Sequence, residues 1–122
     1  MQRLGRKISG GKYKKFRKKK LYELPGKPRP VRLGAEKRKM LKGRSGILKS
    51  VLLTAEKAYV LDKKTGKIKA AKIKTVLETP SNQFLARANL LMKGAIIDTE
   101  AGKARITNRP GQEGKIQAVL VD

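Results

Sequence analysis

The chain has 122 residues and carries 32 lysines and arginines against nine acidic residues, which gives a formal net charge of +23. One domain is the expected count at this length, and because only 4% of the residues are aromatic, its core must be small and aliphatic. The absence of cysteine and histidine excludes a disulfide framework, a thiolate nucleophile and the usual zinc sites. These absences exclude most hydrolase and metalloenzyme chemistry, and we expect no cofactor and no small-molecule substrate.

The positive charge is concentrated in the first half of the chain. Residues 1–50 have a net charge of +17, whereas residues 51–122 have one of +6. The first 22 residues hold ten cations, no acid and few apolar side chains, so we expect them to be disordered in isolation. A block of this kind predicts a polyanionic partner, nucleic acid first, although solvated faces and localisation signals are also basic.

The sequence LPGKPRP at 24–30 separates this block from the rest of the chain. Its three prolines exclude a helix and disfavour a central strand, which predicts an extended linker. From residue 31 the sequence turns to short Val, Ile and Leu runs between turn signals, typical of an all-β protein. We predict a basic extension with its linker at 1–30 and a β-barrel domain at 31–122: a small antiparallel barrel of about six strands, with at most one short helix.

The first predicted strands are 47–54, 58–62 and 67–77. The sequence DKKTG at 62–66 predicts the hairpin turn between the second and third, with Gly66 at positive φ. In 67–77, Ile68 and Ala70 share one face, and Ala71, Ile73 and Thr75 then take over. This change of phase indicates a β-bulge, and although the segment around Ile73 would also suit a short helix, we favour the strand.

Apolar residues at 84, 85, 88, 91 and 92 predict a short helix, with Thr79 and Pro80 as its possible cap and first residue. Two further hairpins are expected. One joins strands 95–100 and 103–107 across Ala101 and Gly102, and the other leads to strand 115–121 across the turn at 110–114. The last third of the chain is therefore predicted to be antiparallel sheet.

The extension is the strongest candidate for a nucleic-acid-binding site. Its cations suit phosphates, and Gly10 and Gly11 would let the main chain approach a sugar-phosphate backbone closely. Tyr13, Phe16 and Tyr22 could stack on unpaired bases or could instead dock the extension onto the β domain. The candidate RNA-binding residues in this segment are Arg3, Arg6, Lys7, Gly10, Gly11, Lys12, Tyr13, Lys14, Lys15, Phe16, Arg17, Lys18, Lys19 and Lys20.

The predicted sheet offers a second set of charged residues. Solvent exposure and RNA contact are equally good interpretations of its lysines at 67, 69, 72 and 74. Arg105 and Arg109, beside the turn at Pro110, are better placed to bind phosphates through two parallel N–H groups of each guanidinium. Asp98 and Glu100 could bind a metal or serve in acid-base catalysis, but without a third ligand or a base, charge balance is the favoured explanation.

Two stretches resemble a known family, the S-eight-e ribosomal proteins of the archaeal and eukaryotic small subunit, in their short archaeal form. RKISGGKYKKFRKKKLYEL at 6–24 is similar to the family's basic Ser/Thr-Gly-Gly signature ending in Glu23 and Leu24. MKGAIIDTEAGKARITNRPGQEGKIQAVLVD at 92–122 is the more specific match, through KGAII, TEAGKAR and RPGQ-acid-G.

The resemblance implies a structural, non-enzymatic protein of the small ribosomal subunit in the cytoplasm. Its partners would be small-subunit ribosomal RNA and neighbouring ribosomal proteins. The implied fold is a β-barrel whose N-terminal extension threads into folded RNA. The implied contacts are Arg6, Lys7, Ser9, Gly10, Gly11 and Lys12, the run from Lys14 to Lys20, and Arg105, Arg109 and Gly111.

Composition alone leaves other functions open. A non-ribosomal β-barrel factor or RNA chaperone that binds nucleic acid transiently would have the same charge. A peripheral membrane binder is weaker, because the basic tail lacks the broad apolar face that amphipathic anchors need. No run approaches the roughly 20 apolar residues of a spanning helix, and no secretory signal is visible, so we expect a soluble protein without a membrane partner.

Overall fold

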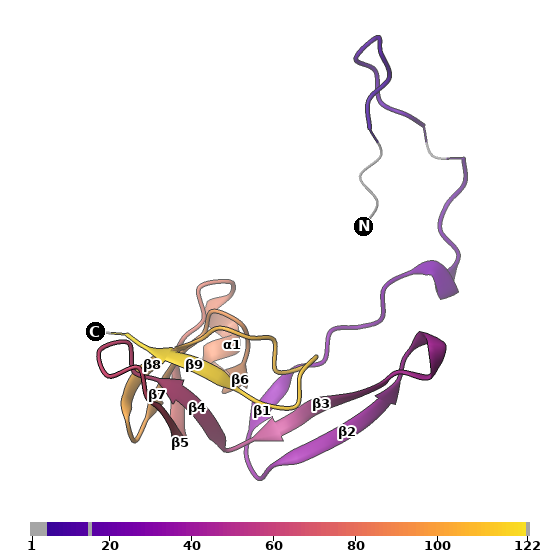
Figure 1. Ribbon diagram of the computed structural model, residues 1–122. Coiled ribbons are helices and arrows are strands. Elements are labelled where there is room, and N and C mark those ends of the chain that lie inside the picture. Colours follow the sequence, from indigo (N-terminus) through magenta and orange to yellow (C-terminus); the bar gives the residue numbers. More distant parts are fainter. Residues whose placement is uncertain (1–4, 15, 122) are drawn as a thin grey trace.

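The computed structural model describes residues 5–14 and 16–121, and these form an all-β body from which the N-terminal segment projects (Figure 1). The body consists of a closed five-stranded barrel, in the order β4-β5-β7-β8-β9, and a four-stranded sheet, in the order β2-β3-β1-β6. The prediction of a small all-β barrel is thus confirmed. The described residues contain nine strands rather than about six, because the sequence did not reveal β1, β2 and the two-residue β6.

The elements follow one another along the chain with short connections. They are the 3-10 turn η1 (Leu21–Glu23), β1 (Val31–Leu33), β2 (Lys37–Lys42), the 3-10 turn η2 (Arg44–Gly46), β3 (Leu48–Ala55), β4 (Lys57–Leu61), β5 (Ile68–Glu78), α1 (Gln83–Arg87), β6 (Leu90–Leu91), β7 (Ile96–Thr99), β8 (Gly102–Ile106) and β9 (Gln117–Leu120).

The barrel is a meander that closes on itself. Along the barrel order β4-β5-β7-β8-β9 each strand pairs antiparallel with the next, so in this odd set of five the first and last strands run in the same direction. Closure between β4 and β9 is therefore parallel, with Val60 opposite Ala118. The expectation of purely antiparallel pairing is wrong at this seam.

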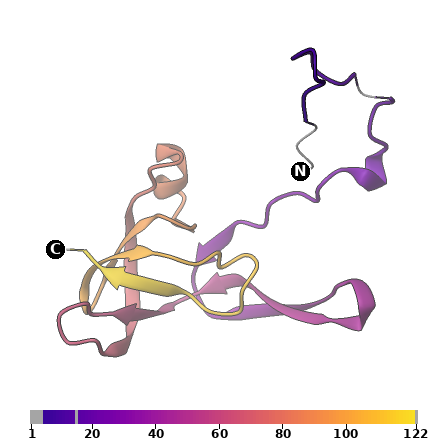
Figure 2. The same ribbon diagram turned by 45° about the horizontal axis from the view of Figure 1, so that its top comes forward.

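The second sheet is joined to the barrel through a nearly continuous strand. Only Glu56 separates β3 from β4, so the chain passes from one sheet directly into the other. Within this sheet β1 pairs parallel with β3 and antiparallel with β6, while β2 and β3 form a long antiparallel hairpin. The hairpin extends beyond the rest of the body (Figures 1 and 2).

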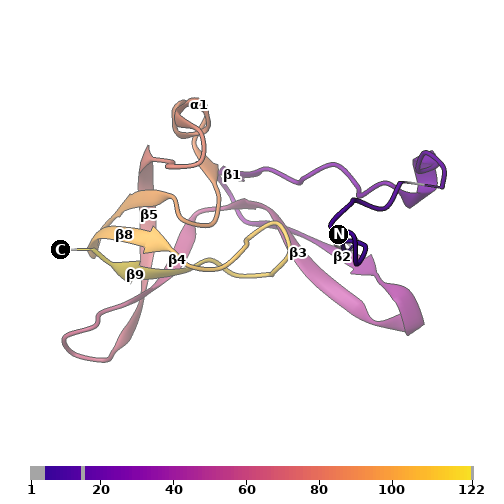
Figure 3. The same ribbon diagram turned by 90° about the horizontal axis from the view of Figure 1, so that it is seen from above.

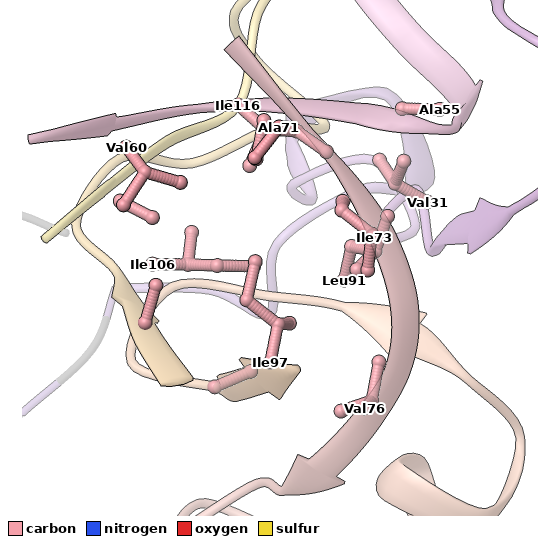
Figure 4. Close-up of a cluster of buried hydrophobic side chains, with 14 of the residues drawn as sticks. Val31, Ala55, Val60, Ala71, Ile73, Val76, Leu91, Ile97, Ile106 and Ile116 are labelled. Atoms are coloured by element: carbon pink, nitrogen blue, oxygen red, sulfur yellow. The ribbon is translucent and has the colours of Figure 1, made fainter. Parts of the chain in front are cut away.

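One aliphatic core spans both sheets (Figure 4). Val31 and Ala55 of the four-stranded sheet belong to the same buried cluster as Val60, Ile97 and Ile106 of the barrel. Each of these side chains is at most 3% exposed. Because burial of such side chains is the main stabilising contribution in a domain of this size, the two sheets stabilise one another.

Strand β5 confirms the preference for strand over helix and also shows a change of phase. Ala71 and Ile73 are buried as expected, but Thr75 is exposed and Val76 is buried. Against β7 the register shifts between Ile73 and Thr75 and again between Val76 and Glu78, whereas pairing with β4 is regular across 68–72. The predicted bulge therefore exists, but farther along the strand than expected.

The predicted helix is shorter than expected and has a different cap. Asn82 caps α1, because its side-chain oxygen accepts a hydrogen bond from the backbone N–H of Phe84 at 3.0 Å. Thr79 is instead fully buried next to β5, and Leu91 belongs to β6. The turn at 62–66 is confirmed, with Gly66 at φ 66° and its N–H bonded to the carbonyl of Asp62.

Candidate nucleic-acid interface

The glycine-rich segment of the extension forms a small hairpin. The backbone N–H of Lys7 donates to the Gly11 carbonyl and the N–H of Gly10 donates to the Lys7 carbonyl, both at 2.9 Å. Arg6 and Lys12 pair across its base. Gly10 has φ 79°, the left-handed conformation that a three-residue hairpin loop requires at its last position.

This hairpin gives the predicted contact residues a local shape. The Arg6 guanidinium also donates to the Gly10 carbonyl at 2.8 Å, which ties the side chain to the loop. Ser9 occupies the loop tip and is exposed, as are Lys7 and Lys12 at its base. The hairpin at 6–12 and its cations are thus positioned by hydrogen bonds between residues close in sequence. Arg3 and Lys15, which the sequence also nominated, lie outside the described residues.

A second fixed point in the extension is the ion pair between Arg17 and Glu23. The guanidinium donates two hydrogen bonds to the carboxylate, at 2.8 and 2.6 Å, and the backbone N–H of Lys20 donates a third at 3.0 Å. The Arg17 hydrogen bonds lower the pKa of Glu23, the Lys20 N–H lowers it further, and the pKa of Arg17 rises. Arg17 therefore orients the bend at η1, a role the sequence did not assign to it.

The aromatic side chains of the extension do not dock onto the body. Phe16 is fully exposed, Tyr22 is 77% exposed and Tyr13 is 52% exposed. The Lys7 ammonium lies 5.9 Å from the centre of the Tyr13 ring, and the Lys20 ammonium lies 6.0 Å from that of Tyr22. Of the two interpretations left open, docking onto the body is wrong for these exposed rings, and a lysine ammonium lies over one face of Tyr13 and of Tyr22.

Gly111 is the point at which the linker meets the body. A Cβ atom at this position would lie 2.7 Å from the carbonyl oxygen of Arg29, so only glycine fits here without movement. The preceding Pro110 is fully buried, and its carbonyl accepts a hydrogen bond from the N–H of Leu52 in β3. Gly111, nominated as an RNA contact, thus holds the base of the extension against the body.

The remaining residues of the 108–115 loop form hydrogen bonds within the loop and pack closely against β3. Asn108 donates to the carboxylate of Glu113 and to the Lys115 carbonyl, and it accepts from the N–H of Gln117. A Cβ on Gly114 would lie 2.8 Å from the hydroxyl of Ser50, which is a second close approach between this loop and the sheet. The specific NRPGQEGK sequence at 108–115 therefore has a packing explanation.

Arg105 and Arg109 lie in different surroundings. Arg109 is exposed directly before Pro110, at the point where the linker leaves the body. Arg105 points out of the barrel from β8 and lines an open depression of about 680 Å³ with the turn after Asp62 and the end of β9. Arg109 is thus two residues from Gly111, which lies against Arg29 of the linker, whereas Arg105 lies beside the turn after Asp62.

The lysines of β5 do not act as one group. Lys72 forms an ion pair with Glu56 at 2.6 Å, which lowers the pKa of Glu56 and raises that of Lys72. Lys69 and Lys74 are exposed. In the described part of the chain, no three carboxylates, histidines or cysteines gather as a metal site, and no helix is long and apolar enough to cross a membrane.

One cationic element was missed by the sequence reasoning, the β2–β3 hairpin. The run KRKMLKGRSGILK at 37–49 has six cations and no acid. The run of cations is visible in the sequence, but because no strands were predicted at 37–42, these charges could not be assigned to a common surface. In the structure they project to the same side of the body as the extension (Figures 1 and 3).

Comparison with known proteins gives a consistent result over nearly the whole chain. The protein-family model described as "Ribosomal protein S8e" matches residues 1–121. Two similar curated proteins, both called "Small ribosomal subunit protein eS8", come from Methanocorpusculum labreanum and Sulfurisphaera tokodaii. The first is 44% identical over 96% of this chain and 94% of its own length. The second is 42% identical over 95% and 91%.

Proposed function

The chain belongs to the ribosomal protein S8e family, and from this premise we propose that it binds ribosomal RNA as a structural constituent of the small ribosomal subunit. Its location is accordingly the small subunit of the cytoplasmic ribosome. The relatives are named as ribosomal proteins, so no catalytic activity, cofactor or small-molecule substrate is proposed. Neighbouring ribosomal proteins would be its further partners.

The observation that carries the proposal is the state of the cations in the extension. The described residues 5–24 contain eight lysines and arginines, and a carboxylate pairs with only one of them, Arg17. The others are exposed on a segment that stands away from the body (Figure 2). Such a segment repels itself unless anions neutralise it, and RNA phosphates are the anions a ribosome supplies in excess.

We assign different roles to different parts of the extension. The hairpin around Gly10 presents Arg6, Lys7, Ser9 and Lys12 to phosphates at a fixed spacing, with Gly11 in its backbone. Lys14, Lys18, Lys19 and Lys20 neutralise phosphates farther along, as Arg3 and Lys15 would. Tyr13 and Phe16 stack on unpaired bases, which is worth about 1–3 kcal/mol per base. Arg17 and Gly111 position the segment, while Arg105 and Arg109 add phosphate contacts from the body.

The mechanism is charge neutralisation linked to RNA folding. Cations placed between converging RNA helices screen phosphates that repel one another. A protein that binds only the folded RNA stabilises that fold by mass action. We accordingly assign residues 1–30 to the RNA-binding extension and residues 31–122 to the barrel domain, against which the base of the extension lies.

The test is a salt series on the full chain with small-subunit ribosomal RNA, with duplex DNA and unrelated RNA as competitors. Substitution of Lys12, Lys14 and Lys18 by Gln should lower the logarithmic salt slope of binding by about 2–3. A matched control replaces Lys67, Lys74 and Lys93, three exposed lysines outside the proposed contacts, by Gln. Equal affinities and slopes for the two variants would refute the role of the extension.

A further inference from the structure

The β2–β3 hairpin has the charge density of the extension but a different architecture. Its residues 37–49 carry six cations in 13 positions, against ten in the first 22 residues of the chain. Unlike the extension, it is a paired ribbon whose register runs without interruption from Arg38 opposite Leu52 to Lys42 opposite Leu48. These cations are therefore held at fixed positions before any partner arrives.

The base of the ribbon is attached to the body and its tip is free. Gly114 approaches Ser50 closely, and the Lys49 ammonium donates to the Gln112 side chain at 3.4 Å. Met40, opposite Ser50, is 59% exposed, and Leu48, nearer the tip, is 64% exposed. The ribbon thus projects past its last support, to the same side as the extension (Figure 3).

The tip itself is a tight, hydrogen-bonded turn. The N–H of Gly43 donates to the Ile47 carbonyl at 2.7 Å. Ser45 and Gly46 both have positive φ, at 57° and 73°, which reverses the chain within four residues. This turn leaves Arg44 exposed at the end of the ribbon, next to Ile47, which is 68% exposed.

Internal partners account for some of the hairpin cations but not for all of them. Arg38 pairs with Glu36, and Lys49 bonds Gln112. Among the described residues no carboxylate lies within ion-pair distance of Lys39, Lys42 or Arg44. Alternation along β2 places Lys39 on one face of the ribbon and Lys42 on the other. Both faces and the tip are thus cationic.

Protection against aggregation explains only part of this pattern. Lysines on the edge strand β2 would discourage pairing with another sheet. That explanation does not cover Arg44 at the turn, and it is opposed by the exposed apolar side chains of Met40, Ile47 and Leu48, which would promote association. A partner that takes both cations and apolar groups explains the whole set.

We propose that the β2–β3 hairpin is a second RNA-binding arm, independent of the extension. The inference rests on the proposed function. The run of six cations without an acid favours RNA over a protein partner, because a protein would need an acidic groove to match. Lys39, Lys42 and Arg44 bind phosphates, and the apolar tip lies against sugars and base edges in the shallow minor groove of an RNA helix.

The first test removes charge from the full chain. Substitution of Lys39, Lys42 and Arg44 by Gln should lower the salt slope by about 2–3, and at 0.15 M salt this corresponds to an affinity loss on the order of a hundredfold. Substitution of Ile47 and Leu48 by Ser should weaken binding without changing the slope. The lysine control at 67, 74 and 93 should do neither. A hairpin variant that matches this control overturns the inference.

The extension variant in the same series separates the two proposals. If only the extension variant loses affinity, the hairpin inference fails and the proposed function stands. If neither variant differs from the control, both fail. Circular dichroism of each variant checks the fold, which should not change because the substituted side chains are exposed.

The second test locates the arm in the subunit. Since the chain has no cysteine, an Ile47→Cys variant carries a single thiol to which an iron-EDTA cleaver can be tethered. We expect cleavage of ribosomal RNA from position 47 in reconstituted subunits. A photo-crosslinker on the same thiol that labels only protein would overturn the inference, because the hairpin would then contact a neighbouring protein.

Discussion

Replacing Gly111 by Ala tests whether the base of the extension is held by close packing. The new Cβ would lie 2.7 Å from the Arg29 carbonyl oxygen, whereas ordinary contact begins at 3.4 Å. One of the two segments must therefore move by about 0.7 Å. Overpacking of this kind typically costs about 1–3 kcal/mol.

The linker is the segment expected to move. Pro110 is fully buried, and its carbonyl bonds Leu52, which fixes the loop. In the described chain, no backbone hydrogen bond holds residues 25–30. The free energy of unfolding should therefore fall by only about 1 kcal/mol, near the lower end of the range, which corresponds to roughly 4 °C in a domain of this size. The extension should leave the body in a different direction.

Amide chemical shifts measured by NMR, together with thermal unfolding, check this expectation. Shifts should change at Arg29 and Val31 and across β3, while the barrel strands keep theirs. Gly26→Ala is the matched control, because a Cβ there has no atom within 4 Å and the backbone is not left-handed. Unchanged shifts around Arg29 in the Gly111→Ala variant, or shifts equal to those of the control, would refute the packing argument.

Three further predictions concern single groups. Thr79→Val should leave the urea midpoint unchanged or raise it, because the buried hydroxyl of Thr79 has no hydrogen-bond partner among the described residues; a lower midpoint contradicts this. Because the pKa of Glu23 is lowered below its ordinary 4.5, the ion pair with Arg17 should persist at neutral pH and be lost as the pH falls through that lowered pKa. An NMR titration of the Glu23 carboxylate with a midpoint at 4.5 or above would contradict this. Gly10→Ala should open the hairpin in the extension at a cost of about 1 kcal/mol, seen as lost amide protection, whereas Gly5→Ala should not.

The barrel could be predicted from the sequence because its hairpins have local signals. The turn at Gly66, the strand that follows it and the three strands of the last third all came from alternation and turn residues. Parallel closure was predictable in principle, because in a row of five strands paired antiparallel the first and the last run in the same direction. It was missed because the sequence shows hairpins, and the seam between β4 and β9 joins residues some 60 positions apart.

The four-stranded sheet had no comparable signal. Strand β1 has three residues and β6 has two, and both are stabilised by pairing with distant segments rather than by their own pattern. Strand β2 has almost no buried side chain, so its run of cations resembled the extension more than a strand. The bulge in β5 was misplaced for a related reason, because Thr75 is compatible with either face and only pairing with β7 decides.

For the candidate site, the sequence identified the cationic segment but not the contacts that its residues make within the protein. Charge and resemblance both predicted Arg17 as an RNA contact, and the resemblance alone predicted Gly111. The structure places Arg17 against Glu23 and Gly111 against Arg29, where they shape and anchor the extension. Such contacts depend on the folded path of the chain. A composition argument counts Arg17 as one more cation and has no means of noticing its carboxylate partner.

The arrangement of charge follows from the size of the core. A small aliphatic cluster cannot offset the repulsion of +23 charges gathered on one compact surface. Residues 51–122, which include all five barrel strands, carry only +6, whereas the +17 of the first half lies largely on the extension and the β2–β3 hairpin, both of which project from the body. Projection lowers the repulsion between these charges and the core-forming strands, and it exposes them to an external polyanion. We therefore expect the barrel to fold without RNA, and we expect the extension, unlike the paired β2–β3 hairpin, to depend on RNA for its final order.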